Sequence, residues 1–323
     1  MPSARLAVAA TLAALAVVAS SVAAPRTPKL GFSVFVHTSQ NMDSIVWTGQ
    51  EFLYVQNTEN TVFSGPPTGL PIHVFATMPK LVEETRCILS PGTHGWPSGS
   101  IFCHSPDDKV YELPAAGGSS KVFATLPVPA GTVSDGALIW DDVGKFGYKL
   151  VAATGRTGKG APLNGTVYTI DPSGTVEQVG TYQGPGADEV AIAPQGFGAI
   201  AGDALLGEDG GDVPADLLAM DPSGQTHTVV RVASGINPMI PIPAVRARTG
   251  LPHPGLYLTD DLSGNTYFAP ASQLAAYAGD VFVASETGGH MWILEPHGSS
   301  FRAIPVRHNA LHAKSIEAGI IVP

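Results

Sequence analysis

The strongest constraint on the fold is an internal repeat. Residues 74–79 (VFATMP) recur at 122–127 (VFATLP), and residues 168–174 (YTIDPSG) recur at 218–224 (LAMDPSG), with a looser copy at 291–298. Each copy joins a short apolar segment to an alternating one through a Pro/Gly turn, which is typical of a β-hairpin. The chain is therefore built from repeated hairpins.

The spacing of these hairpins predicts the architecture. The first five of six turn prolines lie about 50 residues apart, which is the length of one four-stranded propeller blade. These prolines are Pro66, Pro114, Pro172, Pro222, Pro270 and Pro296. A second strand pair precedes each hairpin, for example 137–140 with 149–152. A lone blade cannot bury both of its faces, so the repeats must stack around an axis. We predict an all-β, six-bladed β-propeller in one domain, with five or seven blades as alternatives.

The end of the repeat array predicts how the ring closes. The interval from Pro270 to Pro296 is only half a period. We interpret it as a final blade that is completed by both ends of the chain. Residues 33–37 and 316–322 are expected to supply its missing strands.

Composition excludes one class of partner. The formal net charge is −10, and no cluster of Lys and Arg occurs along the chain. Binding to the phosphates of a nucleic acid requires such a cluster, so we expect no nucleic-acid partner.

The N-terminus predicts export. Arg5 precedes an apolar stretch from Leu6 to Ala19, and small residues follow at 21–23. This is the pattern of a signal peptide over residues 1–23 with cleavage before Ala24. An uncleaved membrane anchor is the alternative, although the stretch is short for a span. We expect a mature domain over residues 24–323 that has no membrane span, is monomeric, and is secreted, extracellular or attached to the cell envelope.

The two cysteines fit this context. Cys87 and Cys103 are the only ones, and an even pair in an oxidising compartment predicts one disulfide. A catalytic cysteine or a metal-binding pair is the alternative, but CxxC spacing is absent.

Polar, mostly acidic residues lead into the segments expected to form the innermost strand of each blade. They are Asp43, Glu84, Asp135, Asp188, Glu189, Asn237 and Glu317. Carboxylates that converge on one axis repel each other unless a cation or protons neutralise them. Oxygen ligands of this kind suit a hard divalent ion such as Ca²⁺. Alternatively, these side chains only solvate the channel or cap turns.

This arrangement resembles the SMP-30/gluconolactonase and strictosidine-synthase-like six-bladed propellers. The resemblance extends over the mature chain as architecture, and residues 315–319 (SIEAG) look like the Glu-Gly entry to an inner strand in that family. It implies a divalent metal in the central channel, held by Glu317, Asn237 and Asp188, with Glu189 beside them. In the family this Glu opens the first blade, whereas here it stands near the C-terminus.

Two main functions follow from these features. The first is a metal-dependent hydrolase of a lactone or ester, with Asp135 or Asp43 as the general base. The second is a non-catalytic propeller that binds a ligand or protein. In either case we expect a small molecule to bind in the central channel. A structural or envelope-associated protein is a third possibility, and the fold alone does not choose among them.

Overall fold

The computed structural model describes the chain from residue 27 to residue 323, apart from residues 58, 60, 80–83, 129–131, 134–136, 158–163, 185, 209–212, 245–252, 288 and 310–314. The predicted signal peptide lies outside the described residues and stays a prediction. Within the described part of the chain, no helix has both the length and the apolar character needed to cross a membrane.

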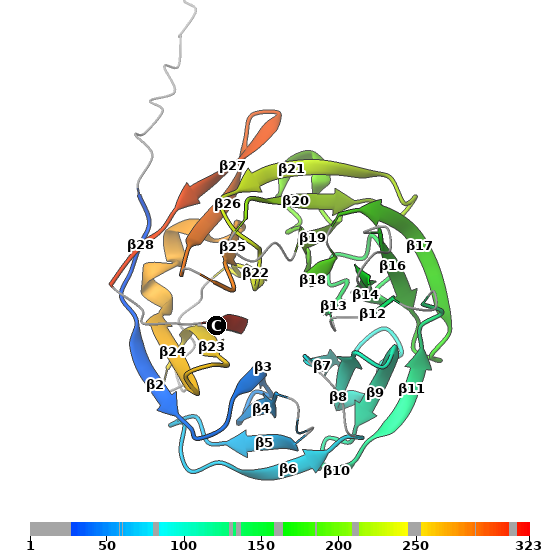
Figure 1. The fold of residues 1–323 in the computed structure, drawn as a ribbon, viewed down its shortest axis with the longest axis vertical. Helices are drawn as coiled ribbons and strands as arrows, with labels where there is room; N and C mark the ends of the chain where they lie inside the picture. The colour runs from blue at the N-terminus through cyan, green and yellow to red at the C-terminus, as the bar shows by residue number, and fades with distance from the viewer. Residues whose placement is uncertain are drawn as a thin grey trace, which may run out of the picture.

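Six blades, each with four antiparallel strands, surround a central axis, which confirms the predicted six-bladed β-propeller (Figure 1); the sheet of blade 1 has a fifth, parallel strand of two residues. The strands of blades 1 to 4 follow the chain from the axis outward. Blade 1 contains β3 (Met42–Trp47), β4 (Phe52–Gln56), β5 (Thr61–Gly65) and β6 (His73–Thr77). Blade 2 contains β7 (Arg86–Pro91), β8 (Ser98–Ser105), β9 (Lys109–Leu113) and β11 (Lys121–Thr125). Blade 3 contains β13 (Leu138–Trp140), β14 (Leu150–Thr154), β16 (Asn164–Ile170) and β17 (Val176–Gln183). Blade 4 contains β18 (Ala187–Ile192), β19 (Ala204–Glu208), β20 (Ala215–Met220) and β21 (Thr226–Val232).

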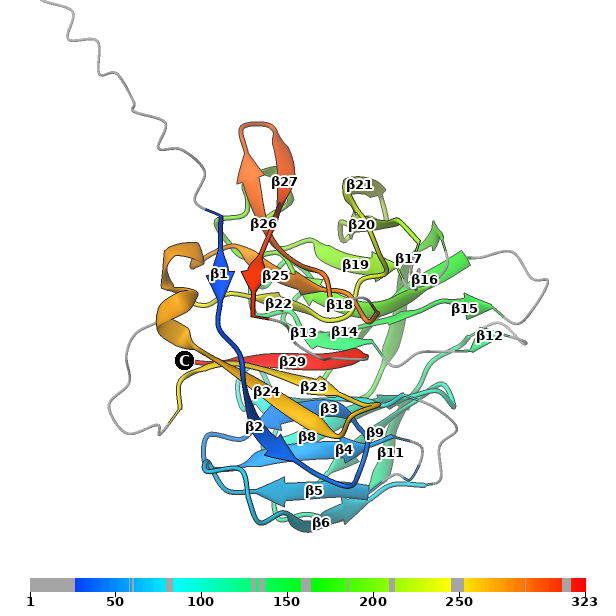
Figure 2. The same ribbon diagram turned by 60° about the vertical axis from the view of Figure 1, so that its left-hand side comes forward.

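The last two blades are interleaved along the chain. Blade 5 contains β22 (Met239–Pro241), β25 (Val281–Ala284), β26 (Met291–His297) and β27 (Ser300–Pro305). Blade 6 contains β29 (Ile316–Val322), β23 (Gly255–Asp260), β24 (Asn265–Pro270) and β2 (Ser33–His37). The chain thus leaves blade 5 after one strand, forms the middle hairpin of blade 6, and returns to complete blade 5 (Figures 1 and 2).

Both ends of the chain do complete one blade, as predicted. β2 pairs with β24 on the outside and β29 pairs with β23 on the inside. The sequence interpretation was wrong about the hairpin between them, which is β23–β24 and not the half-period hairpin around Pro296. Proline spacing records the order of hairpins along the chain, but it does not record which inner strand each hairpin joins.

The remaining elements are short. β1 (Lys29–Leu30) pairs with β28 (Arg307–His308), β10 (Gly118–Ser119) pairs with β6, and β12 (Thr132–Val133) pairs with β15 (Arg156–Thr157). Three single-turn 3-10 helices are η1 (Gly198–Ile200), η2 (Ala271–Gln273) and η3 (Ala275–Tyr277).

The core is divided among the blade interfaces. Buried apolar residues form six clusters, and each cluster joins two neighbouring blades. In β8, Ile101 and Cys103 pack toward blade 1, whereas Phe102 between them packs toward blade 3. Successive side chains of a strand point to opposite faces, so a middle strand of a blade needs apolar residues on both. This explains continuous runs such as LVAA in β14 and VFVA in β25.

A repeated contact fixes the outer rim of the ring. The outer strands β6, β11 and β17 each contain a bulge, at Phe75, Phe123 and Val179. A turn glycine of the next blade packs on the carbonyl oxygen of each bulge residue. These glycines are Gly117, Gly174 and Gly224, and an added Cβ would lie 2.3, 2.6 and 2.6 Å from the respective oxygens. The repeated Pro/Gly turns seen in the sequence are therefore contacts between blades.

We predict that Gly174→Ala lowers the free energy of unfolding by about 2–4 kcal/mol, through a left-handed backbone and a clash with the Phe123 carbonyl. Gly174 has φ +85°. Gly298 is the matched control: it occupies a hairpin turn with φ +64°, and no atom lies within 4 Å of a Cβ added there. Gly298→Ala should cost only about 1 kcal/mol. Urea unfolding measures both values, and equal losses would show that the bulge contact contributes nothing.

Candidate functional site

The predicted leading residues converge at one mouth of the ring. Asp43 lies in β3, Glu189 in β18 and Glu317 in β29, while Glu84 and Asn237 each stand two residues before the start of β7 and β22. Innermost strands of a propeller run in the same direction along the axis, so their first residues meet. The structure therefore brings together five of the seven residues that the sequence selected.

One arginine lies at the centre of this group. Arg86, the first residue of β7, donates to the backbone carbonyl of Asp43 at 2.6 Å and is 6% exposed. Its guanidinium forms ion pairs with Glu84 at 3.0 Å, Glu317 at 3.3 Å and Glu189 at 3.5 Å. These partners belong to blades 1, 2, 4 and 6. We name Arg86, Asp43, Glu84, Glu189, Asn237 and Glu317 the axial cluster.

Glu317 is the most fully satisfied carboxylate of the axial cluster. Its Oε2 accepts from Arg86 at 3.3 Å and from Asn237 Nδ2 at 3.0 Å, and its Oε1 accepts from Ser315 Oγ at 2.7 Å. The side chain is only 2% exposed. Asn237 adds blade 5 to the network. A buried carboxylate is stabilised only when its oxygens are bonded in this way.

Asp43 is also buried, but its carboxyl group has fewer hydrogen bonds than that of Glu317. Its Oδ2 accepts from the backbone N–H of Thr85 at 3.4 Å, and its Oδ1 has no hydrogen-bond partner among the described residues. Burial raises the pKa of Asp43 to about 8; the nearby Arg86 opposes this rise and Glu317 adds to it. Asp43 is therefore largely protonated at neutral pH.

The pKa values of Glu189 and Asp261 are raised as well. Burial raises the pKa of Glu189 to about 7, with Arg86 opposing the rise and Glu317 contributing to it. Burial and the charge of Glu317 raise the pKa of Asp261 to about 6. Asp261 Oδ2 accepts from Asn57 Nδ2 at 3.4 Å. One guanidinium and the protons bound by raised-pKa carboxyls together reduce the negative charge at this mouth.

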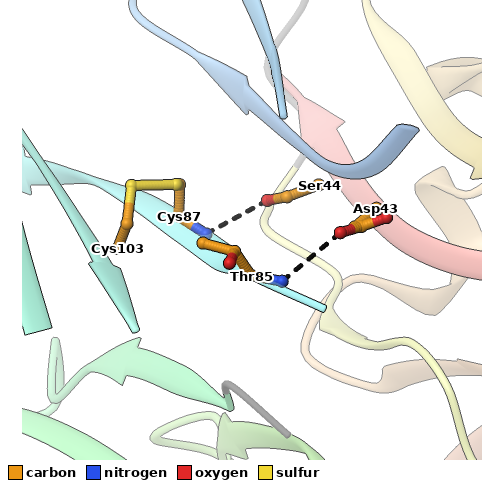
Figure 3. The surroundings of a disulfide bond; sticks show 5 residues. All are labelled: Asp43, Ser44, Thr85, Cys87 and Cys103. Atoms are coloured by element: carbon orange, nitrogen blue, oxygen red, sulfur yellow. Dashed lines mark hydrogen bonds between the residues drawn. A yellow bond between two sulfur atoms is a disulfide. The ribbon is translucent and has the colours of Figure 1, made fainter. Parts of the chain in front are cut away.

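The disulfide is confirmed and supports the axial cluster. Cys87 and Cys103 are joined, and they face each other directly across β7 and β8 (Figure 3). The N–H of Cys87 donates to Ser44 Oγ at 3.1 Å, beside the contact between Thr85 and Asp43. β7 is thus tied to its own blade by the disulfide and to blade 1 by hydrogen bonds, which positions Arg86.

The axial cluster does not suit a divalent cation as it is arranged. A guanidinium already lies between Glu84, Glu189 and Glu317, and it would repel a second cation. Among the residues that the structure describes, no group of three or more His, Cys, Asp or Glu side chains is placed to hold a metal ion. Metal binding by Glu317, Asn237, Asp188 and Glu189 stays a prediction from the sequence.

Two predicted site residues are not placed by the structure. Asp135 lies outside the described residues. Asp188 belongs to β18, but its side chain is outside the description. The role of Asp135 or Asp43 as a general base stays a prediction, and of these two the structure places Asp43 alone.

Sequence reasoning missed Arg86, Ser315 and Asp261. Arg86 could have been identified from the sequence, because it is a charged residue at the start of the otherwise mostly apolar inner strand RCILSP. Asp261 lies in a hairpin turn, in which the N–H of Gly264 donates to the carbonyl of Asp260 at 3.0 Å, and turn residues of this kind give no separate sequence signal for a site.

Below the axial cluster, a cavity of about 220 Å³ runs between the inner strands of all six blades. Arg86 and Glu189 close one end, and the walls are mostly apolar. We name this cavity the axial channel.

No protein-family model matches the chain, and no curated protein sequence matches it. Solved structures of similar fold include a nidogen/laminin complex, with a TM-score of 0.58 and 8% identity over 90% of this chain and 89% of the other. A second is the PQQ-bound aldose sugar dehydrogenase of Streptomyces coelicolor, with a TM-score of 0.54 and 12% identity over 90% and 98%. The apo aldose sugar dehydrogenase of Escherichia coli gives 0.53 and 9% over 86% and 89%. At these identities the comparisons establish the fold alone.

We predict that Arg86→Ala lowers the free energy of unfolding by about 3–5 kcal/mol, because it leaves buried carboxylates without their cation. Arg302→Ala is the control, since Arg302 pairs with Glu295 at the exposed rim and its loss should cost less than about 1 kcal/mol.

The same variant tests the metal hypothesis. Millimolar Ca²⁺ should raise the melting temperature of Arg86→Ala, because the freed carboxylates then need a cation, and should leave the native protein unchanged. A native protein that loses stability in EDTA would contradict the assignment of Arg86 as the central cation.

We also predict that stability falls as pH rises from about 5 to 8. The unfolded Asp43 carboxyl loses its proton near pH 4, whereas the folded one keeps it until about pH 8. The folded state therefore binds more protons in this window, at up to about 1.4 kcal/mol per pH unit for each proton. Asp43→Asn should flatten the dependence in denaturant titrations at several pH values. An unchanged slope would show that Asp43 does not titrate there.

Proposed function

We propose that the protein is an exported, non-catalytic binding propeller in which the axial cluster is a structural element. The observation that carries this proposal is the position of Arg86. Its guanidinium contacts residues of four blades and takes the place that a catalytic cation would need. The cluster is also buried, with Asp43 and Glu317 exposed by no more than 2%.

Burial of the axial cluster argues against hydrolysis at this mouth. A general base must lie within hydrogen-bonding distance of the substrate or of an attacking water. Glu317 is occupied by three donors, and Asp43 is protonated at neutral pH. Neither carboxyl is arranged to accept a proton from a bound water.

Export is supported by two independent features. The first is the signal-peptide pattern at residues 1–23. The second is the disulfide between Cys87 and Cys103, since disulfides persist in oxidising compartments. We therefore place the mature protein outside the cell or in the cell envelope.

One observation favours a second function, a hydrolase of the lactone or ester type. The pKa values of Asp43 and Glu189 are raised to about 8 and 7. Strongly shifted carboxyls beside a cation occur at catalytic sites as well as in structural networks. The similar structures include both a complex of two proteins and sugar dehydrogenases, so the fold does not choose between binding and catalysis.

We predict that the mature protein hydrolyses a δ-lactone and a p-nitrophenyl ester no faster than buffer, with or without Ca²⁺. Asp43→Asn should behave identically. Asp280→Asn is the matched control, because the pKa of Asp280 is also raised, to about 6, in blade 5 away from the axial cluster. Turnover that is lost in Asp43→Asn and kept in Asp280→Asn would overturn the non-catalytic proposal.

A further inference from the structure

The mouth opposite the axial cluster contains a second cavity. This cavity has a volume of about 510 Å³ and lies beside the ends of β13, β18, β22 and β29. We name it the exit cup. Its apolar walls are Val143, Ile192, Pro194, Ile242 and Pro243.

The exit cup and the axial channel are adjacent and share part of their walls. Ile240, Pro241 and Ile321 line both cavities. The channel continues inward from these residues along apolar side chains that include Ile45, Ile88, Leu138, Val190 and Met239. Apolar side chains therefore extend from the exit cup along the axial channel toward Arg86. At that end Arg86 is already ion-paired with Glu84 and Glu317.

The polar rim of the exit cup is rigidly built. Asp141 accepts from the N–H groups of Gly144, Phe146 and Tyr148 at 2.8, 2.6 and 3.0 Å, which orders the loop that contributes Asp142 and Tyr148. Lys145 of this loop donates to the carbonyl of Ala201 in blade 4 at 3.1 Å. A rim held in this way loses little conformational entropy when a ligand binds.

Tyr148 is fixed from two sides. Its ring stacks on His94 with centroids 3.8 Å apart and planes 1° apart, and its carbonyl accepts from Trp96 Nε1 at 2.9 Å. Its backbone adopts φ +59°, which is unfavourable for a side chain of this size. Strained residues of this kind gather at ligand sites. Tyr148 nevertheless remains 39% exposed at the cup.

From these observations we infer that the exit cup and axial channel bind an uncharged amphiphile, an aliphatic chain with a hydroxyl-bearing head. This inference names a ligand class for the proposed binding function and so rests on it. The chain lies in the apolar channel, and the head lies at the rim beside Asp142, Tyr148 and Gln195. An anionic head is disfavoured there, because Asp142 is the one charged side chain among the described residues that line the exit cup.

Titration calorimetry with 1-decanol, 1-butanol and decanoate tests the inference on the mature protein. One molecule of decanol should bind per chain, and at least tenfold more tightly than butanol, since each buried methylene contributes a factor of about four. Decanoate should bind at least tenfold more weakly than decanol. Absence of saturable decanol binding overturns the site, and tighter decanoate binding overturns the class of head group.

Ile321→Glu locates the ligand. A carboxylate at the junction of the two cavities should reduce decanol affinity at least tenfold. Leu262→Glu is the control, because Leu262 is 57% exposed in a hairpin turn and lines neither cavity. Unchanged affinity in folded Ile321→Glu overturns the location. Should that variant fail to fold, Gln195→Trp at the exposed rim replaces it, with the same expected loss. Decanol binding and hydrolysis are measured in separate assays. The ligand class and the non-catalytic function can therefore be contradicted independently of each other.

Discussion

The structure depends on one electrostatic contact, the pairing of a single guanidinium with the acidic residues that the propeller gathers on its axis. Inner strands that run in one direction gather the leading residues of blades 1, 2, 4, 5 and 6 around one guanidinium. In this chain those residues are mostly acidic, and burial makes their mutual repulsion expensive. Arg86 offsets part of that cost from within the chain, and the raised pKa values of Asp43 and Glu189 lower it further by favouring their neutral forms.

The outer rim is held by a different interaction that repeats from blade to blade. A bulge in one outer strand projects a carbonyl toward the next blade, where only a glycine leaves room for it. The apolar clusters between the blades then fill the space from rim to axis. The axis is thus held by charge, the middle by apolar packing and the rim by close backbone contacts.

The sequence allowed the fold to be predicted in some detail. Repeated hairpins about 50 residues apart specify a propeller, because such units bury their faces only by stacking. The half-period at the end specified that residues 33–37 and 316–322 share a blade, and they do. The exchange of hairpins between blades 5 and 6 was not predictable, since strand pairing depends on long-range contacts that leave no local pattern.

The candidate site was only partly predictable, for a similar reason. Asp43, Glu189 and Glu317 occupy the same position within their repeats, which predicted that they would lie close together on the axis. It did not predict which cation would pair with them. Arg86 lies two residues beyond the acidic Glu84, and its reach across the axis depends on side-chain direction. The exit cup is formed by loop residues such as Asp142 and Tyr148, whose positions depend on hydrogen bonds to Asp141.

The interleaving of blades 5 and 6 limits how the molecule can vary in evolution. Blades 1 to 4 are continuous segments of chain, so gain or loss of one such unit leaves the others intact. Blades 5 and 6 exchange strands in both directions, and excision of either one removes part of the other. This linked pair is therefore inherited as a single unit, and changes in ring size are confined to the segment of chain that forms blades 1 to 4, from Met42 to Val232.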